Sequence, residues 1–99
     1  MSELELLFSA HLDDAGIPYT REYQAVPGRK LRWDFFIAPD ILVEINGGIW
    51  QRSGHTSGRG VQRDYDKINL ATLHGYRVFL YSADDVTSNR AIETIKEIL

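Results

Sequence analysis

Asp34 and Glu44 are two acidic residues on the two arms of a predicted β-hairpin. The apolar segments 31–37 and 41–46 flank a short turn, 38–40, of sequence Ala-Pro-Asp. If this turn is three residues long, position 37 pairs with position 41, and the same register places Asp34 opposite Glu44. Opposed side chains of this kind lie about 4.5–5.5 Å apart at Cβ, and like charges there are destabilising. The pattern shows no obvious cation beside them, so a divalent metal ion is one way to keep both ionised.

Oxygen ligands from two carboxylates suit Mg²⁺ or Mn²⁺ better than zinc. Such an ion lowers the pKa of a bound water molecule and neutralises charge that builds up on a phosphodiester. The alternative is a purely structural one, in which Asp34 pairs with Arg32 or Arg29 and Glu44 caps an exposed strand edge. The residues alone leave both interpretations open.

Polar residues after Glu44 extend the candidate site. Asn46 shares the face of Glu44 and could hold a water molecule or a phosphate oxygen, or it could simply end the strand in an Asn-Gly-Gly turn. The segment 47–60 contains five glycines and predicts a long loop that carries Arg52, His55 and Arg59. Glycines let a backbone approach a phosphate, and arginines bind one bidentately. A histidine there suits proton transfer near neutral pH, or it is merely solvated.

Two predicted helices could add further groups to this site. In the helix expected over 61–74, Gln62, Asp66 and Asn69 share a face with Arg63 and Lys67 beside them, and this face either reaches the carboxylates or is solvated. In the N-terminal helix, Glu5 completes a capping box with Ser2 or reaches the same site as an additional carboxylate.

The elements that must position these side chains follow the order α-β-β-β-α-β-α. Hydrophobic periodicity and turn residues predict helices and strands, with the strand at 76–81 (YRVFLY) central and buried. The predicted stripe of the 61–74 helix contains Val61, Tyr65, Ile68 and Thr72, and the final helix is expected to be continuous. The predicted elements are helix 2–15, strands 19–26, 31–37 and 41–46, helix 61–74, strand 76–81 and helix 86–99.

Composition favours one folded domain spanning residues 1–99. The chain is 43% hydrophobic and 11% aromatic, which excludes a disordered polyelectrolyte. It has no cysteine, so disulfides and thiolate metal sites are excluded and a reducing cytoplasm is the expected compartment. No segment resembles a signal peptide or a membrane span. The net charge of −3 argues against indiscriminate polyanion binding, but it is compatible with basic groups concentrated on one face.

Several short motifs together resemble the PD-(D/E)XK nucleases, most closely the small phage-type VRR-NUC/Holliday-resolvase-like proteins and the Vsr-like endonucleases. They are an Asp within a strand, Glu-x-Asn-Gly-Gly at the end of the next strand, and Trp then His in a glycine-rich loop. A helix and strand of the form Asp-x-x-Lys-x-Asn-x-Ala-x-x-x-Gly-Tyr-Arg-Val follow at 64–78. The resemblance covers about half of the chain directly. It implies an α/β, restriction-endonuclease-like αβββαβ core with a mixed central sheet flanked by helices.

The resemblance also implies roles by position. Asp34 and Glu44 look like metal ligands, joined by the main-chain carbonyl of Ile45, and Glu5 resembles a helix glutamate that some members place near the metal. His55 corresponds to a loop histidine that assists catalysis in Vsr-like enzymes.

Asn46 departs from the family pattern, because the superfamily usually has a lysine there. That lysine would orient the attacking water and stabilise the phosphate. Three possibilities follow: Lys67 or Gln62 substitutes from the helix, which we favour, His55 does so, or the protein is weakly active.

The resulting hypothesis is a Mg²⁺- or Mn²⁺-dependent DNA endonuclease, selective for a structure such as a junction, flap or repair intermediate. Its backbone contacts would come from Arg52, His55, Arg59 and Arg63. One protomer supplies one catalytic centre, so cutting both strands suggests a homodimer, in a bacterial or phage-infected cell. The alternative is a catalytically silent nucleic-acid-binding or protein-binding module on the same scaffold.

Overall fold

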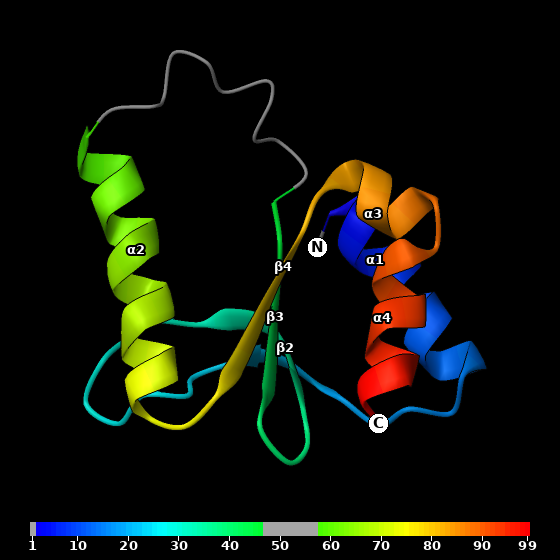
Figure 1. Cartoon of the computed structure of the whole chain (residues 1–99), viewed down its shortest axis with the longest axis horizontal. Helices are drawn as coiled ribbons and strands as arrows, with labels where there is room; N and C mark the ends of the chain where they lie inside the picture. Colours follow the sequence, from blue (N-terminus) through cyan, green and yellow to red (C-terminus); the bar gives the residue numbers. More distant parts are fainter. Residues whose placement is uncertain (1, 47–57) are drawn as a thin grey trace.

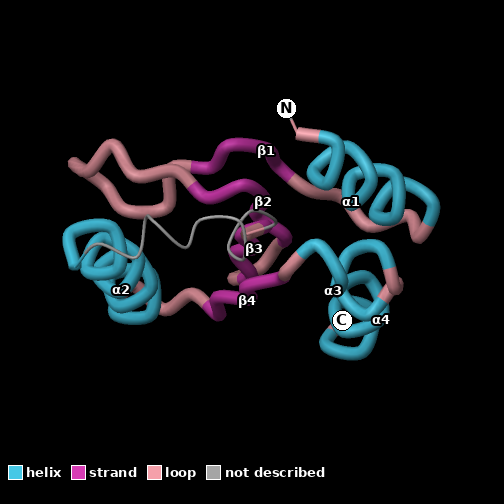
Figure 2. The backbone as a smooth tube through the Cα atoms, turned by 90° about the horizontal axis from the view of Figure 1, so that it is seen from above, coloured by secondary structure: helices cyan, strands magenta, loops and turns pink. Residues whose placement is uncertain are grey.

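A four-stranded mixed sheet with helices on both faces forms the centre of the molecule (Figures 1 and 2). The structure is a computed structural model that describes residues 2–46 and 58–99, with side chains in the second range from residue 62 onward. The predicted fold class is confirmed. The elements are α1 (Glu3–Asp14), β1 (Thr20–Tyr23), β2 (Trp33–Ile37), β3 (Ile41–Ile45), α2 (Gly58–Leu73), β4 (Arg77–Tyr81), α3 (Ala83–Thr87) and α4 (Arg90–Ile98).

The register of the central hairpin is the predicted one. Strands run in the order β1-β2-β3-β4, with the first three antiparallel and β4 parallel to β3. In the β2–β3 pair, Phe35 faces Val43 and Ile37 faces Ile41, across a turn at 38–40. One further step along this register brings Asp34 level with Glu44. The alternation of apolar and polar residues therefore specified the pairing, because a slip by one residue would turn the charges into the core.

Helices α1, α3 and α4 cover one face of the sheet (Figure 2). Phe8 and Leu12 of α1 are fully buried there, and the Phe8 ring meets the Phe35 ring edge-on at 5.0 Å between centroids. Ile95 of α4 and Val43 of β3 belong to the same cluster. Ser2 caps α1 as predicted, since its hydroxyl accepts from the Glu5 N–H at 3.1 Å and donates to the Glu5 carboxylate at 3.2 Å.

Helix α2 covers the opposite face with a smaller cluster, in which Trp33, Leu42 and Ala71 are fully buried. Strict alternation along 31–37 predicts that Trp33 shares the apolar layer of Phe35, and this prediction is wrong. Phe35–Val43 is the last pair of the β2–β3 ladder, and Trp33 lies beyond it. There the carboxylates of Asp34 and Glu44 accept hydrogen bonds from the main chain of the opposite strand, so side chains no longer alternate strictly between the two faces of the sheet.

The stripe with which α2 packs also differs from the predicted one. Tyr65 is 56% exposed and Thr72 is exposed, whereas Ala71 is buried and Ile68 is half-buried. The helix begins at Gly58 instead of position 61. The small Ala71 allows α2 to approach the sheet closely. Lys67 lies one helical turn before Ala71, so it shares the side of α2 that faces the sheet.

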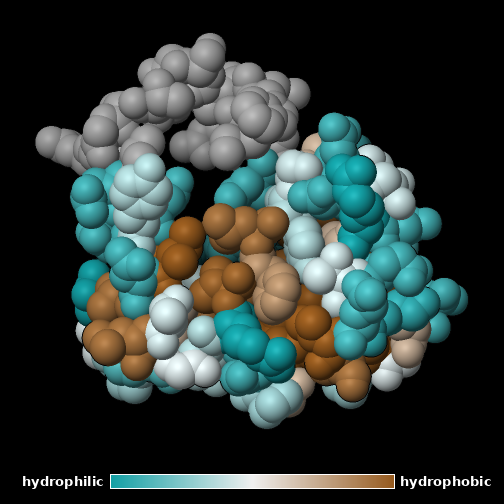
Figure 3. Space-filling view, in the orientation of Figure 1, coloured by the Kyte–Doolittle hydropathy of each residue, from teal (hydrophilic) through white to brown (hydrophobic). Residues whose placement is uncertain are grey.

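Two further predictions are wrong. β4 lies at the border of the sheet within the described part of the chain, and Leu80 is 45% exposed. Apolar atoms are accordingly visible between α2 and the α3–α4 pair in Figure 3. The C-terminal helix is divided: Ser82 caps α3 in a capping box with Asp85, and Asn89 then adopts a left-handed φ of 70° before α4 begins. None of the helices in the described ranges is long and apolar enough to cross a membrane.

Candidate active site

Carboxylates from three adjacent strands form a row across one end of the sheet. The β1–β2 register pairs Arg21 with Phe35 and Tyr23 with Trp33, so Glu22 is level with Asp34. Asp34 is in turn level with Glu44 on β3. Like charges in such positions repel each other, so the row needs compensating groups.

Asp34 and Glu44 each bind the main chain of the other strand. The Asp34 N–H donates to Glu44 Oε1 at 3.0 Å, and the Ile45 N–H donates to Asp34 Oδ2 at 2.8 Å. These reciprocal bonds hold both carboxylates at the end of the hairpin. They also place Ile45, whose carbonyl the resemblance implies as a ligand, directly against Asp34.

Both carboxyl groups are harder to ionise than usual. Burial raises the pKa of Asp34 above its ordinary value, partly opposed by the hydrogen bond from Ile45, while the charges of Glu5 and Glu22 raise it further. Burial also raises the pKa of Glu44, and the Asp34 charge adds to this effect, whereas Lys67 lowers it. Burial is the largest cause for both groups, so their ionised forms lack solvation that a nearby cation would replace.

Lys67 brings a positive charge to this row from α2. Its Nζ atom lies 3.0 Å from Glu44 Oε1 and 5.1 Å from the centroid of the Trp33 ring. The side chains of Lys67 and Glu44 are each 18% exposed, so the pair is largely shielded from water. The sequence pattern had shown no cation beside the two carboxylates, and the packing of α2 supplies one.

A second acidic group lies around Asp34. Carboxylate oxygens of Glu5, Glu22 and Asp34 all lie within 4.8 Å of one another. Arg21 forms an ion pair with Glu5, and its Nε donates to the Asp34 carbonyl oxygen at 3.2 Å. The Arg21 guanidinium also lies 4.5 Å from the centroid of the Phe35 ring. Glu44 is not a member of this group, and its carboxylate is held by Lys67 instead.

Glu22 has an unusual backbone, with a φ of 50° inside β1. Left-handed conformations are costly for residues other than glycine, and they persist where the surrounding structure enforces them. Here the conformation accompanies a carboxylate that meets Asp34 and Glu5.

The donor set fits a hard divalent cation. The site has a formal charge of −2, from four carboxylates (Glu5, Glu22, Asp34 and Glu44) and two cations (Arg21 and Lys67). Three of the carboxylates lie close enough together to share one ion, and oxygen is the ligand atom that Mg²⁺ and Mn²⁺ prefer.

A small cavity of about 30 Å³ adjoins the Glu44–Lys67 pair. Its lining includes Trp33, Glu44, Asn46, Asp64 and Lys67. The buried Trp33 Nε1 has no hydrogen-bond partner among the described residues. The cavity has room for about one water molecule, which could accept from this indole N–H.

The remaining predicted site residues fall into two groups. Asn46 lines the cavity beside Glu44, and its N–H donates to the Tyr81 carbonyl at 2.8 Å. Gln62 and Arg63 are exposed, and Gln62 donates to Asp66 at 3.0 Å rather than to the carboxylate row. Arg52 and His55 lie outside the described residues, and so does the side chain of Arg59, whose backbone belongs to the first turn of α2.

Arg21, Glu22 and Asp64 are residues near this site to which the sequence analysis gave no role. Asp64 could have been found, because it lies three residues before Lys67 and hence on the same side of the helix. Arg21 and Glu22 required the β1–β2 register, which the sequence pattern did not specify.

Comparison with solved structures identifies the class of fold. The structure is similar to the catalytic domain of the homing endonuclease I-Bth0305I, with a TM-score of 0.73 and 20% sequence identity. The superposition covers 98% of this chain and 92% of that one. No protein-family model matches the sequence, and no curated protein sequence matches it either. The chain therefore has a nuclease-like mixed α/β fold.

Proposed function

We propose that this protein is a divalent-metal-dependent DNA endonuclease that selects its substrate by structure. The observation that carries the proposal is the row Glu22–Asp34–Glu44, with Lys67 at one end, inside a fold shared with a homing endonuclease catalytic domain. Partly buried carboxylates with raised pKa values and a lysine beside them are typical of catalytic sites.

Asp34, Glu5 and Glu22 would hold the metal ion, and Glu44 with the Ile45 carbonyl completes the candidate ligand set. When bound, Mg²⁺ or Mn²⁺ supplies Lewis-acid stabilisation of the charge that develops on a phosphate. Arg21, which pairs with Glu5 in this structure, would share that carboxylate with the ion.

Lys67 takes the role of the lysine that Asn46 replaces. Its Nζ atom is held at Glu44 and can donate to a phosphate oxygen next to that carboxylate. In the reaction, a water oxygen bonds to phosphorus, one ester P–O bond breaks, and the leaving oxygen takes up a proton. The exposed position of Gln62 favours Lys67 over Gln62 for this role, and His55 remains the candidate for proton transfer.

DNA is the proposed substrate. Contacts from Arg52, Arg59 and Arg63 to the backbone would read shape more than sequence. Cutting of both strands would require a second copy, so we propose a homodimer acting in the cytoplasm of a bacterial or phage-infected cell.

The test is cleavage of supercoiled plasmid, linear duplex, flap and four-way-junction DNA with Mg²⁺, Mn²⁺ or EDTA. Asp34→Asn, Glu44→Gln and Lys67→Met should abolish metal-dependent cutting. The matched control is Asp40→Asn, because Asp40 lies at the other end of the same hairpin, where its carboxylate pairs with Arg77. Equal cutting by wild type and Asp34→Asn would overturn the proposal.

The Arg21–Glu5 ion pair favours a second candidate, a binding module in which an internal arginine takes part of the place of a metal ion. This candidate predicts DNA binding that is indifferent to EDTA and no cutting with either metal. The same assays therefore separate the two functions.

A further inference from the structure

Positive charge without a carboxylate partner is concentrated at one place on the described surface. Nine Lys and Arg side chains are described, and five of them form ion pairs with acidic residues. The paired ones are Arg21, Lys67, Arg77, Arg90 and Lys96. The other four have no ion pair within the described ranges, and we call them the basic rim: Arg29, Lys30, Arg32 and Arg63.

Three members of the basic rim lie in the connection between β1 and β2. Residues 24–32 contain Arg29, Lys30 and Arg32, all exposed, and no acidic residue. Because the whole chain carries a net charge of −3, this segment differs in sign from the average surface. A local positive field on an acidic protein attracts a polyanion to that place and not elsewhere.

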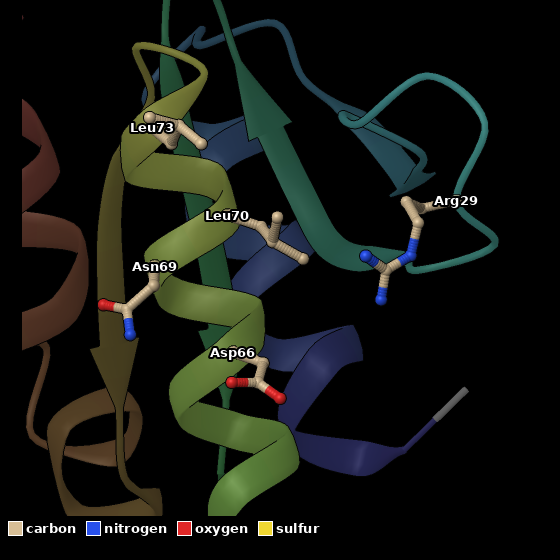
Figure 4. A pocket seen from close by; sticks show the side chains of 5 residues that line it. All are labelled: Arg29, Asp66, Asn69, Leu70 and Leu73. Carbon is tan, nitrogen blue, oxygen red and sulfur yellow. The ribbon is translucent and has the colours of Figure 1, made fainter.

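Arg29 of the basic rim lines a groove of about 310 Å³ between this connection and α2. Figure 4 shows Arg29 extending from the connection toward the helix, with Leu70 directed into the space between them. Asp66, Asn69 and Leu73 complete the lining. Arg63 lies one helical turn before Asp66, so it extends the same side of α2.

The groove's lining itself is not where a phosphate would bind. Arg29 and Asp66 there cancel in formal charge, and Gln62 donates to the Asp66 carboxylate. Phosphates would therefore contact the exposed basic rim at the border of the groove, while Asn69 and Asp66 offer hydrogen-bond acceptors to the amino groups of bases.

The basic rim leads directly to the candidate active site. Arg32 is followed by Trp33, over which Lys67 lies, and then by Asp34. An extended chain spans at most about 3.3–3.6 Å per residue, so Arg29 is at most about 17–18 Å along the chain from Asp34. That reach corresponds to about five nucleotides of one DNA strand, at about 3.4 Å each.

We propose that the basic rim binds the phosphates of a DNA duplex on one side of the Asp34–Glu44 site and sets its register there. This inference rests on the proposed function, because it assigns the surface that holds the substrate of that site. It adds Arg29, Lys30 and Arg32 to the DNA contacts, none of which belongs to the carboxylate row.

The test is the salt dependence of binding to a short fluorescent DNA duplex, measured by anisotropy in EDTA with the full chain. The variant is R29Q/K30Q/R32Q. The control R77Q/R90Q/K96Q removes the same charge with the same residue types, from exposed ion pairs elsewhere. Thermal melting of both variants checks that each is folded.

The rim variant should bind DNA about tenfold or more weakly at about 100 mM salt. The negative slope of log K against log salt should become shallower by close to 3, at about 0.9 per lost phosphate contact. The control should retain the wild-type slope. Equal affinity and slope for wild type and rim variant would overturn the inference, and so would a wild type that binds no DNA at about 50 mM salt.

Cleavage is measured separately, so the two proposals can fail independently. If the wild type binds DNA through the basic rim but does not cut it, the endonuclease proposal is contradicted and the binding role of the basic rim is supported. A wild type that cuts while the rim variant binds unchanged contradicts the rim alone.

Discussion

Lys67 Nζ lies 3.0 Å from Glu44 Oε1, and this contact joins α2 to β3. Glu44 also accepts the Asp34 N–H through the same oxygen, so a single carboxylate oxygen connects the helix and both arms of the hairpin. Because Asn46, directly after β3, carries no charge, the positive charge at this end of the sheet comes from the helix and not from the strand.

Replacing Lys67 by Met keeps the aliphatic stem over Trp33 and removes the charge. Glu44 is then left partly buried without its cation, so we expect a loss of about 1–3 kcal/mol in the free energy of unfolding at neutral pH. Urea denaturation measures this loss. Lys96→Met, which breaks an exposed pair with Glu93, should cost less than about 1 kcal/mol. Equal losses in the two variants would contradict a structural role for the Lys67–Glu44 pair.

The contribution of Asp34 and Glu44 to the stability of the fold should fall as the pH rises from about 4 toward neutrality. Folding raises the pKa of Asp34 and Glu44 above their ordinary values of 3.8 and 4.5, so the folded state binds more protons in the window above those values. Their stabilising effect is complete below the ordinary pKa and is lost as the pH passes through the raised one. Asp34→Asn should therefore gain stability relative to wild type as the pH rises.

Asp85→Asn is the control for that pH series, because folding lowers the pKa of Asp85 instead of raising it. The hydrogen bond from the Ser82 N–H is the main cause that lowers the pKa of Asp85, so its contribution is present at neutral pH and is lost as the pH falls through the lowered value. Asp85→Asn should therefore be less stable than wild type, and this loss in the free energy of unfolding should increase as the pH rises. Unfolding curves at several pH values measure both series, and parallel curves for wild type and Asp34→Asn would refute the assignment.

Glu22→Gly and Glu22→Ala separate backbone conformation from charge. Both remove the carboxylate, but only glycine adopts a φ of 50° without a steric penalty. The glycine variant should therefore be more stable than the alanine variant by about 1 kcal/mol. Both should show a smaller rise in melting temperature with Mn²⁺ than wild type, if Glu22 is a ligand. An alanine variant as stable as the glycine variant would show that position 22 is not strained.

Asn89 offers the same comparison at the break between α3 and α4. Its φ is 70°, and its side chain makes no capping hydrogen bond to α4. Asn89→Gly should leave the free energy of unfolding almost unchanged. Asn89→Ala should lower it by about 1 kcal/mol, because a left-handed φ is sterically unfavourable for alanine. Thermal melting followed by circular dichroism measures both. A more stable alanine variant would mean that a continuous helix forms across the break.

Local pattern alone determined the central hairpin. The alternation in 31–37 and 41–46, with a three-residue turn between them, allows only one register that keeps Asp34 and Glu44 out of the core, and the structure has that register. The N-cap of α1 by Ser2 was equally local, since Ser2 and Glu5 are three residues apart.

Tertiary packing decided which groups meet the carboxylates. Glu22 reaches Asp34 only through the pairing of β1 with β2, and Lys67 reaches Glu44 only because the small Ala71 turns that side of α2 inward. The edge position of β4 likewise depends on strand order, which the apolar sequence of 76–81 does not encode. Periodicity reports which residues share a face, whereas the partner of that face is chosen by the packing of the whole chain.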